Sequence, residues 1–328
     1  MGGGSRMKLK ELYELIIKKG MEFDPRGREV VRKALAKARK EYSKLSKTEK
    51  KEFDSEAFVN PYADTRILYG DLNKEIKKIM IGIDMEVGEL LLADRLNAKS
   101  APGGREKIDL VMAHHPEGRA LAGLYQVMHL QTDILNKAGV SLKAAESLMK
   151  ERIEEVERTL LPANHGRSVD VARLLGMPFM CCHTPGDNCV TTYLTKLMEQ
   201  KKPKTAWDVV SILKEIPEYR EALTQKAGPR LICGERAAKT GKVFVDMTGG
   251  TEGSKNVFAR LSQAGIGTLV CMHLSEEHFK RAKTEFINII IAGHIASDTL
   301  GLNLLLDEIE KKEKLNIISC SGFKRVSR

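Results

Sequence analysis

Histidine and aspartate side chains recur at three places in the chain, each directly after a run of apolar residues. The three segments are Ala113-His114-His115-Pro116, His183-Thr184-Pro185-Gly186-Asp187 and Gly293-His294-Ile295-Ala296-Ser297-Asp298. The apolar runs before them, 108–112, 177–182 and 286–292, predict buried strands. In an open α/β sheet the carboxyl ends of the strands share one edge, where ligand sites form. Imidazoles and carboxylates gathered at such an edge could bind divalent cations.

The first motif places two imidazoles side by side. Pro116 favours an extended backbone at His115, and a twisted strand end could let His114 and His115 serve two neighbouring ions. Taken alone, the pair could also be two hydrogen-bonded histidines of the core or surface. The motif by itself leaves both interpretations open.

The other two motifs share a spacing of four residues between histidine and aspartate. His183 and Asp187 flank Pro185-Gly186, which predicts a turn and not a helix. His294 and Asp298 follow a glycine, and a helix is predicted to begin at Ser297 or Asp298. Either pair alone could be a helix cap or a turn bond. The occurrence of all three motifs in one chain favours a metal site.

Strands and helices alternate from residue 78 onward, which is typical of α/β layers. Further strands are predicted at 79–83, 230–233, 243–247, 267–272 and 316–319. Helices are predicted at 86–96, 119–135, 142–161, 168–175, 255–264, 275–284 and 298–312. Residues 188–226 are predicted to be helical, with breaks at Pro203 and Pro217.

This order of elements predicts an α/β protein of two lobes with an added N-terminal helical extension. Residues 1–6 have the composition of an expression tag, with the natural start at Met7. Residues 7–74 form the extension, in which 53–74 are expected to be irregular. Residues 75–200 form the first lobe, with the HHP and HTxxD motifs, and residues 201–328 form the second, with the GHxxSD motif.

Composition and charge narrow the class of protein. A content of 42% hydrophobic and 30% charged residues argues against disorder, and no apolar run reaches the roughly 20 residues of a membrane span. The six cysteines are expected to be reduced and mostly buried, and with no visible signal peptide they predict a cytoplasmic protein. The net charge is +10, and much of the excess lies in the first helices. Without interleaved aromatic residues this predicts solvated helix faces, and nucleic-acid binding is not expected.

Other polar groups also follow predicted strands. Asp84 and His273 could reach the same sheet edge and act as acid–base groups or support the metal ligands. His273 and His278 are five residues apart and do not share a helix face, which excludes an H-x-x-E-H protease site.

A glycine-rich segment, 248–255, follows a strand and is expected to open a helix. Gly250, Ser254 and Lys255 within it are candidates for binding phosphate, although a plain turn is the alternative. The Gly-Lys-Ser/Thr ending of a P-loop is missing.

The series HHP, HTxxD and GHxxS(E/D), in this order, resembles the Nif-three-like (NGG-one-interacting factor three) family of hexameric dinuclear-metal proteins. The resemblance covers roughly residues 75–320 and implies that the metal ligands are His114, His115, Asp187, His294 and Asp298. It also implies that His183 lies close by, as an outer ligand or as a group that supports the ligands and acts in acid–base chemistry. Asp298 stands where the family usually has Glu, so its carboxylate reaches one methylene less. The N-terminal extension and residues 138–168 are additional, and no large inserted domain separates Asp187 from His294.

The resemblance implies a homohexamer with two divalent ions per chain, and His/carboxylate ligation suits zinc, iron, manganese or cobalt. Some members of the family are named GTP cyclohydrolase I type two. The leading hypothesis is a metal-dependent hydrolase acting on a nucleotide or another phosphorylated small molecule, since two metal ions can activate a water and stabilise charge. The alternative is a non-catalytic metal-binding protein, such as a chaperone or a regulatory partner-binding protein.

Overall fold

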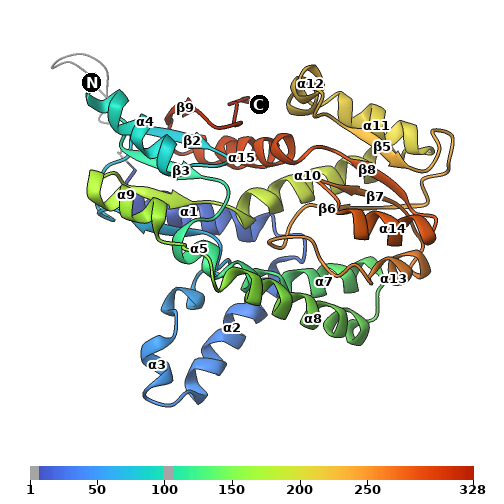
Figure 1. Ribbon diagram of the computed structural model, residues 1–328, viewed down its shortest axis with the longest axis horizontal. Helices are drawn as coiled ribbons and strands as arrows, with labels where there is room; N and C mark the ends of the chain where they lie inside the picture. Colours follow the sequence, from blue (N-terminus) through green and yellow to red (C-terminus); the bar gives the residue numbers. More distant parts are fainter. Residues whose placement is uncertain (1–6, 99–106) are drawn as a thin grey trace.

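Two mixed β-sheets form the framework of the molecule (Figure 1). The computed structural model describes residues 7–98 and 107–328, so the expected tag at 1–6 lies outside the described residues. The five-stranded sheet has the order β1-β4-β3-β2-β9, and the four-stranded sheet has the order β5-β8-β7-β6. The strands are β1 (Arg66–Tyr69), β2 (Lys78–Gly82), β3 (Leu110–Ala113), β4 (Phe179–Cys181), β5 (Arg230–Cys233), β6 (Lys242–Asp246), β7 (Ile266–Cys271), β8 (Asn288–Ile291) and β9 (Asn316–Ser319).

Each sheet is parallel except at one edge. β1 pairs antiparallel with β4, and β5 pairs antiparallel with β8. The parallel strands β2, β3 and β4 are almost entirely buried, as expected for strands covered on both faces. The predicted α/β class is therefore confirmed.

Helices cover both sheets and fill the space between them. They are α1 (Leu9–Glu22), α2 (Arg28–Lys44), α3 (Glu49–Glu52), the 3₁₀ turn η1 (Ser55–Phe58), α4 (Val87–Ala98), α5 (Gly118–Ala122), α6 (Leu124–Val127), α7 (His129–Ala138), α8 (Leu142–Leu160), α9 (Arg167–Leu175), α10 (Thr184–Lys201), α11 (Ala206–Lys214), α12 (Pro217–Thr224), α13 (Phe258–Gln263), α14 (Glu276–Thr284) and α15 (His294–Glu310).

Helices α10 and α15 run side by side through the centre of the molecule (Figure 1). Leu302 and Leu306 of α15 pack into the apolar core of the five-stranded sheet, whereas Leu300 packs into that of the four-stranded sheet. Val190 of α10 also joins the second core, and Cys189 joins the first. These two helices therefore link both sheets, and their packing into the two cores determines the position of their first turns.

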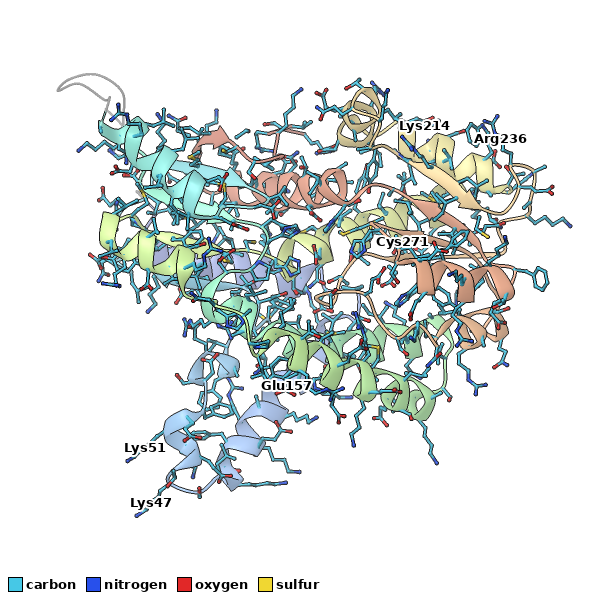
Figure 2. All side chains as sticks on the ribbon, in the orientation of Figure 1. Lys47, Lys51, Glu157, Lys214, Arg236 and Cys271 are labelled. Atoms are coloured by element: carbon cyan, nitrogen blue, oxygen red, sulfur yellow. The ribbon has the colours of Figure 1, made fainter. Side chains whose placement is uncertain are left out.

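The N-terminal segment divides into a buried helix and a projecting arm. α1 buries Leu12, Ile16 and neighbouring residues in the core of the first sheet, whereas α2 buries only Val31. α2 and α3 project from the body, and Figure 2 shows Lys47 and Lys51 at the far end of this arm. The charge excess of the sequence thus lies on solvated helix faces, as predicted.

Several local predictions were wrong. Residues 53–74 are not irregular throughout, because they contain η1 and the edge strand β1. The helix expected at 119–135 is broken into α5, α6 and α7, with Gly123 between the first two. β9, from the range given to the second lobe, pairs with β2 in the first sheet, so the sheets do not follow the lobe ranges at β1 and β9. Apart from these two strands, the division into lobes at 75–200 and 201–328 remains a proposal.

Two further findings concern the class of protein. All six cysteines are free, and Cys181, Cys182, Cys189 and Cys271 are buried, as expected for reduced thiols. Among residues 7–98 and 107–328, no helix is long and apolar enough to cross a bilayer.

Candidate metal centre

The three histidine motifs meet at one point between the sheets. His114 and His115 directly follow β3, and His183 is the residue before α10. His294 is the first residue of α15, which places Asp298 in its first turns. The expected turn at 183–187 is wrong, because α10 already begins at Thr184, with Pro185 in its first turn, where its missing N–H costs nothing. The expected helix start at Ser297 or Asp298 is also wrong.

Gly293 explains the early start of α15. Its φ is +110°, a conformation that L side chains rarely adopt, and an added Cβ would come within 2.5 Å of the Ala227 carbonyl oxygen. This residue lets the chain turn sharply from β8 into the helix. His294 and Asp298 are then one helical turn apart and point to the same side.

Asp298 is the central side chain of the cluster and is 1% exposed. Its Oδ1 lies 3.5 Å from His114 Nε2. Its Oδ2 lies 3.4 Å from His115 Nε2 and 3.6 Å from His294 Nε2. The two oxygens of one carboxylate therefore face two different sets of imidazoles.

Asp187 extends the cluster on the His114 side. Its Oδ1 lies 3.3 Å from His114 Nε2, and its Oδ2 lies 3.7 Å from His183 Nε2. The N-termini of α10 and α15 both lie here, and their partial positive charges favour the carboxylates of Asp187 and Asp298.

Three of the imidazoles are oriented by acceptors behind them. The Nδ1 of His114 lies 3.0 Å from the Cys182 carbonyl oxygen. The Nδ1 of His115 lies 2.6 Å from Asp84 Oδ1, and the Nδ1 of His183 lies 2.8 Å from Asp64 Oδ2. Because each acceptor takes a proton from Nδ1, the lone pair of each neutral ring is on Nε2 and faces the cluster.

Four buried polar atoms in this cluster have no hydrogen-bond partner among the described residues. They are His114 Nε2, Asp187 Oδ1 and both carboxylate oxygens of Asp298. Unpaired buried acceptors are costly, and native proteins seldom leave them together. Three groups of side chains have ligand atoms close enough to hold an ion: His114/His115/His183, His115/His294/Asp298 and His114/Asp187/Asp298. The donor set therefore fits divalent cations.

In the metal-free cluster, the buried carboxylates favour a proton on His114, where a cation would otherwise bind. Burial lowers the pKa of His114, but Asp298 and Asp187 outweigh it and raise the pKa to about 10. Burial raises the pKa of Asp298, but His114 and the other imidazoles bring it well below its usual range. Without a cation, a proton on His114 thus balances the buried carboxylates.

Comparison with solved structures identifies the fold. The chain is 28% identical to the NIF3 superfamily protein from Sphaerobacter thermophilus, with a TM-score of 0.67 over 80% of this chain and 92% of that one. The chain has a NIF3-like fold. Reduced HcgD from Methanocaldococcus jannaschii shares the fold at 15% identity, with a TM-score of 0.52 over 96% of this chain and 98% of that one. No family model and no curated protein matches the sequence.

Two predicted supporting groups of this NIF3-like chain lie against the cluster. Asp84 contacts His115, as described above. The ring centroid of His273 lies 4.8 Å from that of His294, and its Nδ1 lies 3.5 Å from Glu252 Oε1. The hydrogen bond that His273 donates to Glu252 raises the pKa of His273.

The glycine-rich segment of the NIF3-like chain does not open a helix directly, because α13 begins only at Phe258. Gly250 and Ser254 line a pocket that also contains His183, Asp187 and His294. Lys255 instead lines a neighbouring pocket and pairs with Glu277. Two of the three phosphate candidates therefore line the same pocket as these cluster residues, whereas Lys255 does not.

Sequence reasoning missed Asp64 and Glu252. Asp64 is fully buried and also accepts a hydrogen bond of 2.6 Å from Thr184 Oγ1, so it fixes both His183 and the start of α10. It lies before the unpredicted strand β1, and no periodic pattern marks it. Glu252 follows β6 within the glycine-rich segment, and its place after a strand was the available signal.

Proposed function

We propose that this chain binds two divalent metal ions that share Asp298, and that it uses them to hydrolyse a nucleotide or another phosphorylated small molecule. The observation that carries the proposal is the position of Asp298: its two unpaired oxygens face His114 on one side and His115 with His294 on the other. Asp187 adds a second carboxylate to the His114 side. A carboxylate placed in this way suits a bridging ligand.

The five proposed ligands are His114, His115, Asp187, His294 and Asp298. Mixed imidazole and carboxylate donors suit zinc, iron, manganese or cobalt. The aspartate that replaces the family's glutamate still reaches both sets of imidazoles, because α15 begins at His294 and brings its first turns into the cluster.

When bound, such ions act as Lewis acids that activate water and stabilise negative charge on the attacked centre. The chain supplies proton carriers at the edge of the cluster. His183 is held by Asp64, and His273 is held by Glu252, in positions that line the pocket. We propose these two imidazoles as acid–base groups. We also propose that Gly250 and Ser254 contact the substrate's phosphate, and that Lys255, which lines the neighbouring pocket, lies further from it.

A hydrolysis screen of the metal-loaded protein tests this function. We expect phosphate release from p-nitrophenyl phosphate or nucleoside triphosphates, loss of activity with a chelator and recovery on metal addition. His273→Ala should lower kcat by about 10²–10⁴-fold while metal content is unchanged. Lys280→Ala, on the exposed face of α14 beside Glu276, is the matched control.

Two results would contradict the hydrolase. Activity that survives complete metal removal would separate the reaction from the cluster. Full metal occupancy with no turnover of any phosphorylated compound would leave the alternative, a non-catalytic metal-binding, chaperone or regulatory protein.

We further propose that the protein forms a homohexamer and that it is located in the cytoplasm. We do not expect it to bind membranes or nucleic acids. The assembly rests on the resemblance to the family. Exposed apolar side chains on α4, with Leu91 51% and Leu92 45% exposed, offer surface that another copy could cover.

A further inference from the structure

A chain of buried hydrogen bonds runs from the turn after α1 to the edge of the pocket beside the metal cluster. Thr248, which lines that pocket, donates from its hydroxyl to Asn188 Oδ1 at 2.8 Å. Asn188 Nδ2 donates to the hydroxyl oxygen of Tyr62 at 3.2 Å, and that hydroxyl donates to Asp24 Oδ2 at 2.8 Å. All four residues are at most 7% exposed. The chain thus joins four segments that lie far apart in the sequence.

The carboxylate at the far end sets the direction of every bond in this chain. Asp24 accepts from the Arg26 guanidinium, through Nε at 3.0 Å and Nη2 at 2.9 Å, and has no proton to donate. Burial, together with Asp24, raises the pKa of Tyr62 well above its usual value, so the phenol keeps its proton and donates it to Asp24. The phenol oxygen therefore accepts from the amide nitrogen of Asn188, which turns the amide oxygen towards Thr248. The Thr248 hydroxyl must then donate, and this bond fixes its position.

The segment 248–253 needs contacts from outside because it is rich in glycine. Gly249 and Gly250 have φ values of +105° and +89°, and glycine has no strong backbone preference of its own. Gln131 Nε2 of α7 holds the middle of the segment by donating to the carbonyl oxygens of Gly249 and Thr251, both at 2.7 Å. The hydroxyl bond of the first residue holds its start.

The turn after α1 lies against both helices that hold this segment. On α10, Thr192 Oγ1 donates to the Phe23 carbonyl oxygen at 2.6 Å. On α7, Lys137 Nζ donates to the Pro25 carbonyl oxygen at 2.7 Å. Because α10 carries Asn188 and α7 carries the glutamine described above, the position of this turn is coupled to both supports of the segment.

We propose that Thr248, Asn188 and Tyr62 are positioning residues that hold the segment 248–253 in the pocket and thereby determine its affinity for a phosphate group. This inference rests on the proposed function, since it takes this segment as the part of the chain that contacts phosphate. None of the three side chains is a proposed metal ligand, so their effect passes through the position of the backbone. A segment that is already ordered loses less freedom on binding and therefore binds more tightly.

Inorganic phosphate tests the role of Thr248 in the metal-loaded protein. Thr248→Val keeps the shape of the side chain but removes the donor, and we expect the Kd for phosphate in calorimetry to increase by about fivefold or more. Thr248→Ser keeps the donor and should bind phosphate as the wild type does. Metal content should be the same in all of these proteins.

Thr268→Val is the matched control for the loss of a buried threonine hydroxyl. Thr268 is 0% exposed and donates to the Thr240 carbonyl oxygen at 2.8 Å. It lies near the start of β7, whose other end leads to His273. Its loss should lower stability but leave the Kd for phosphate unchanged.

Tyr62→Phe tests whether the effect travels along the chain, because Tyr62 is not among the residues that line the pocket. The variant removes only the hydroxyl, and we expect phosphate to bind about threefold more weakly or worse, with faster hydrogen exchange of the amides of 249–253. Tyr13→Phe is the control, because the Tyr13 hydroxyl is also hydrogen-bonded, to Glu56 and the Thr65 carbonyl oxygen, but outside this chain. With any substrate found in the hydrolysis screen, Tyr62→Phe should raise KM and leave kcat nearly unchanged.

Unchanged phosphate affinity in Thr248→Val or Tyr62→Phe would overturn the inference, as would an equal loss in Thr268→Val or a wild type that binds no phosphate. Loss of metal in Thr248→Val would also overturn it, because the hydroxyl would then support Asp187 and not the segment. Failure of the proposed function is a separate result. If phosphate binding responds as expected but no phosphorylated compound is hydrolysed, the positioning role stands and the hydrolase fails. If hydrolysis occurs with KM unchanged in both variants, the hydrolase stands and the inference fails.

Discussion

His114 and Asp298 show how a few side chains make this cluster depend on a positive charge. Both are buried, and each has an atom without a hydrogen-bond partner among the described residues. His114 donates through Nδ1 to Cys182, so only Nε2 can take a further proton or a metal ion. The proton and the cation therefore compete for one position, which makes metal binding depend on pH.

Metal affinity should increase as the pH rises. The pKa of His114 in the metal-free cluster is about 10, so at neutral pH the ring is protonated and a cation must displace that proton. Displacement of one proton should tighten Kd by about tenfold per pH unit below that pKa. Competition titrations against a chelator calibrated at each pH measure this slope. A Kd that is constant between pH 7 and pH 9 would contradict the assigned protonation.

Residue types and order in the sequence were enough to predict the histidines and aspartates of the cluster. His114, His183 and His294 each follow an apolar run, and strand ends in α/β proteins converge. Asp64 could not be found in this way, because a single buried carboxylate before a four-residue strand has no periodic signature. Its importance appears only from its contacts with His183 and Thr184.

At the scale of elements, the contact between α10 and α15 sets the distance between Asp187 and Asp298. The two helices approach closely where Gly186 faces Gly301. A Cβ added at Gly301 would lie 2.4 Å from the Gly186 carbonyl oxygen, which is backbone and cannot move aside easily. Gly186 in turn lies against the His114 ring, where an added Cβ would come within 3.3 Å of Cε1. This glycine contact thus helps to position the cluster.

Gly301→Ala should push α10 and α15 apart. We expect a loss of about 1–3 kcal/mol in the free energy of unfolding, because overpacking against backbone cannot relax locally. Metal content should fall as well, since Asp187 and Asp298 separate. Denaturant unfolding of the metal-free protein and elemental analysis measure the two effects. Gly88→Ala in α4 is the control, because an added Cβ there meets nothing within 4 Å. Equal stability and metal content in the two variants would refute this role of the helix contact.

Element types were predicted better than element ends. The turn expected at 183–187 is the first turn of α10, because Pro185 is tolerated at a helix start as readily as in a turn. β1 was missed because four residues, with a register shift between Ile67 and Tyr69, are too few to show alternation. The error hardly affects the predicted position of His183, because that residue follows β4 whether a turn or a helix comes next.

At the scale of the molecule, the fold closes by a pairing between distant parts of the chain. β9 comes from the end of the chain and pairs in parallel with β2, which lies more than 200 positions earlier, as the numbers of Ile317 and Ile79 show. Local pattern predicted β9 as a strand but could not say which sheet it joins, because strand pairing depends on the tertiary structure. Because the chain runs from β8 through α15 to β9, it leaves the four-stranded sheet and ends at the edge of the five-stranded sheet.

The protein should form a homohexamer in solution. Light scattering should give about six times the chain mass of 36.6 kDa, since the resemblance to the family implies a closed ring. The exposed leucines of α4 give such an assembly apolar surface to bury. A monomer mass at micromolar concentration would exclude the hexamer, whatever the state of the metal site.

Elemental analysis of the metal-loaded protein and of Asp298→Asn tests the central claim most directly. If Asp298 is shared by two ions, the wild type and the control Asp170→Asn should each hold two ions per chain. Asp298→Asn should hold fewer than one, because the loss of one carboxylate removes a donor from both sites. Two ions retained by Asp298→Asn, or none bound by the wild type after loading, would contradict the shared metal centre.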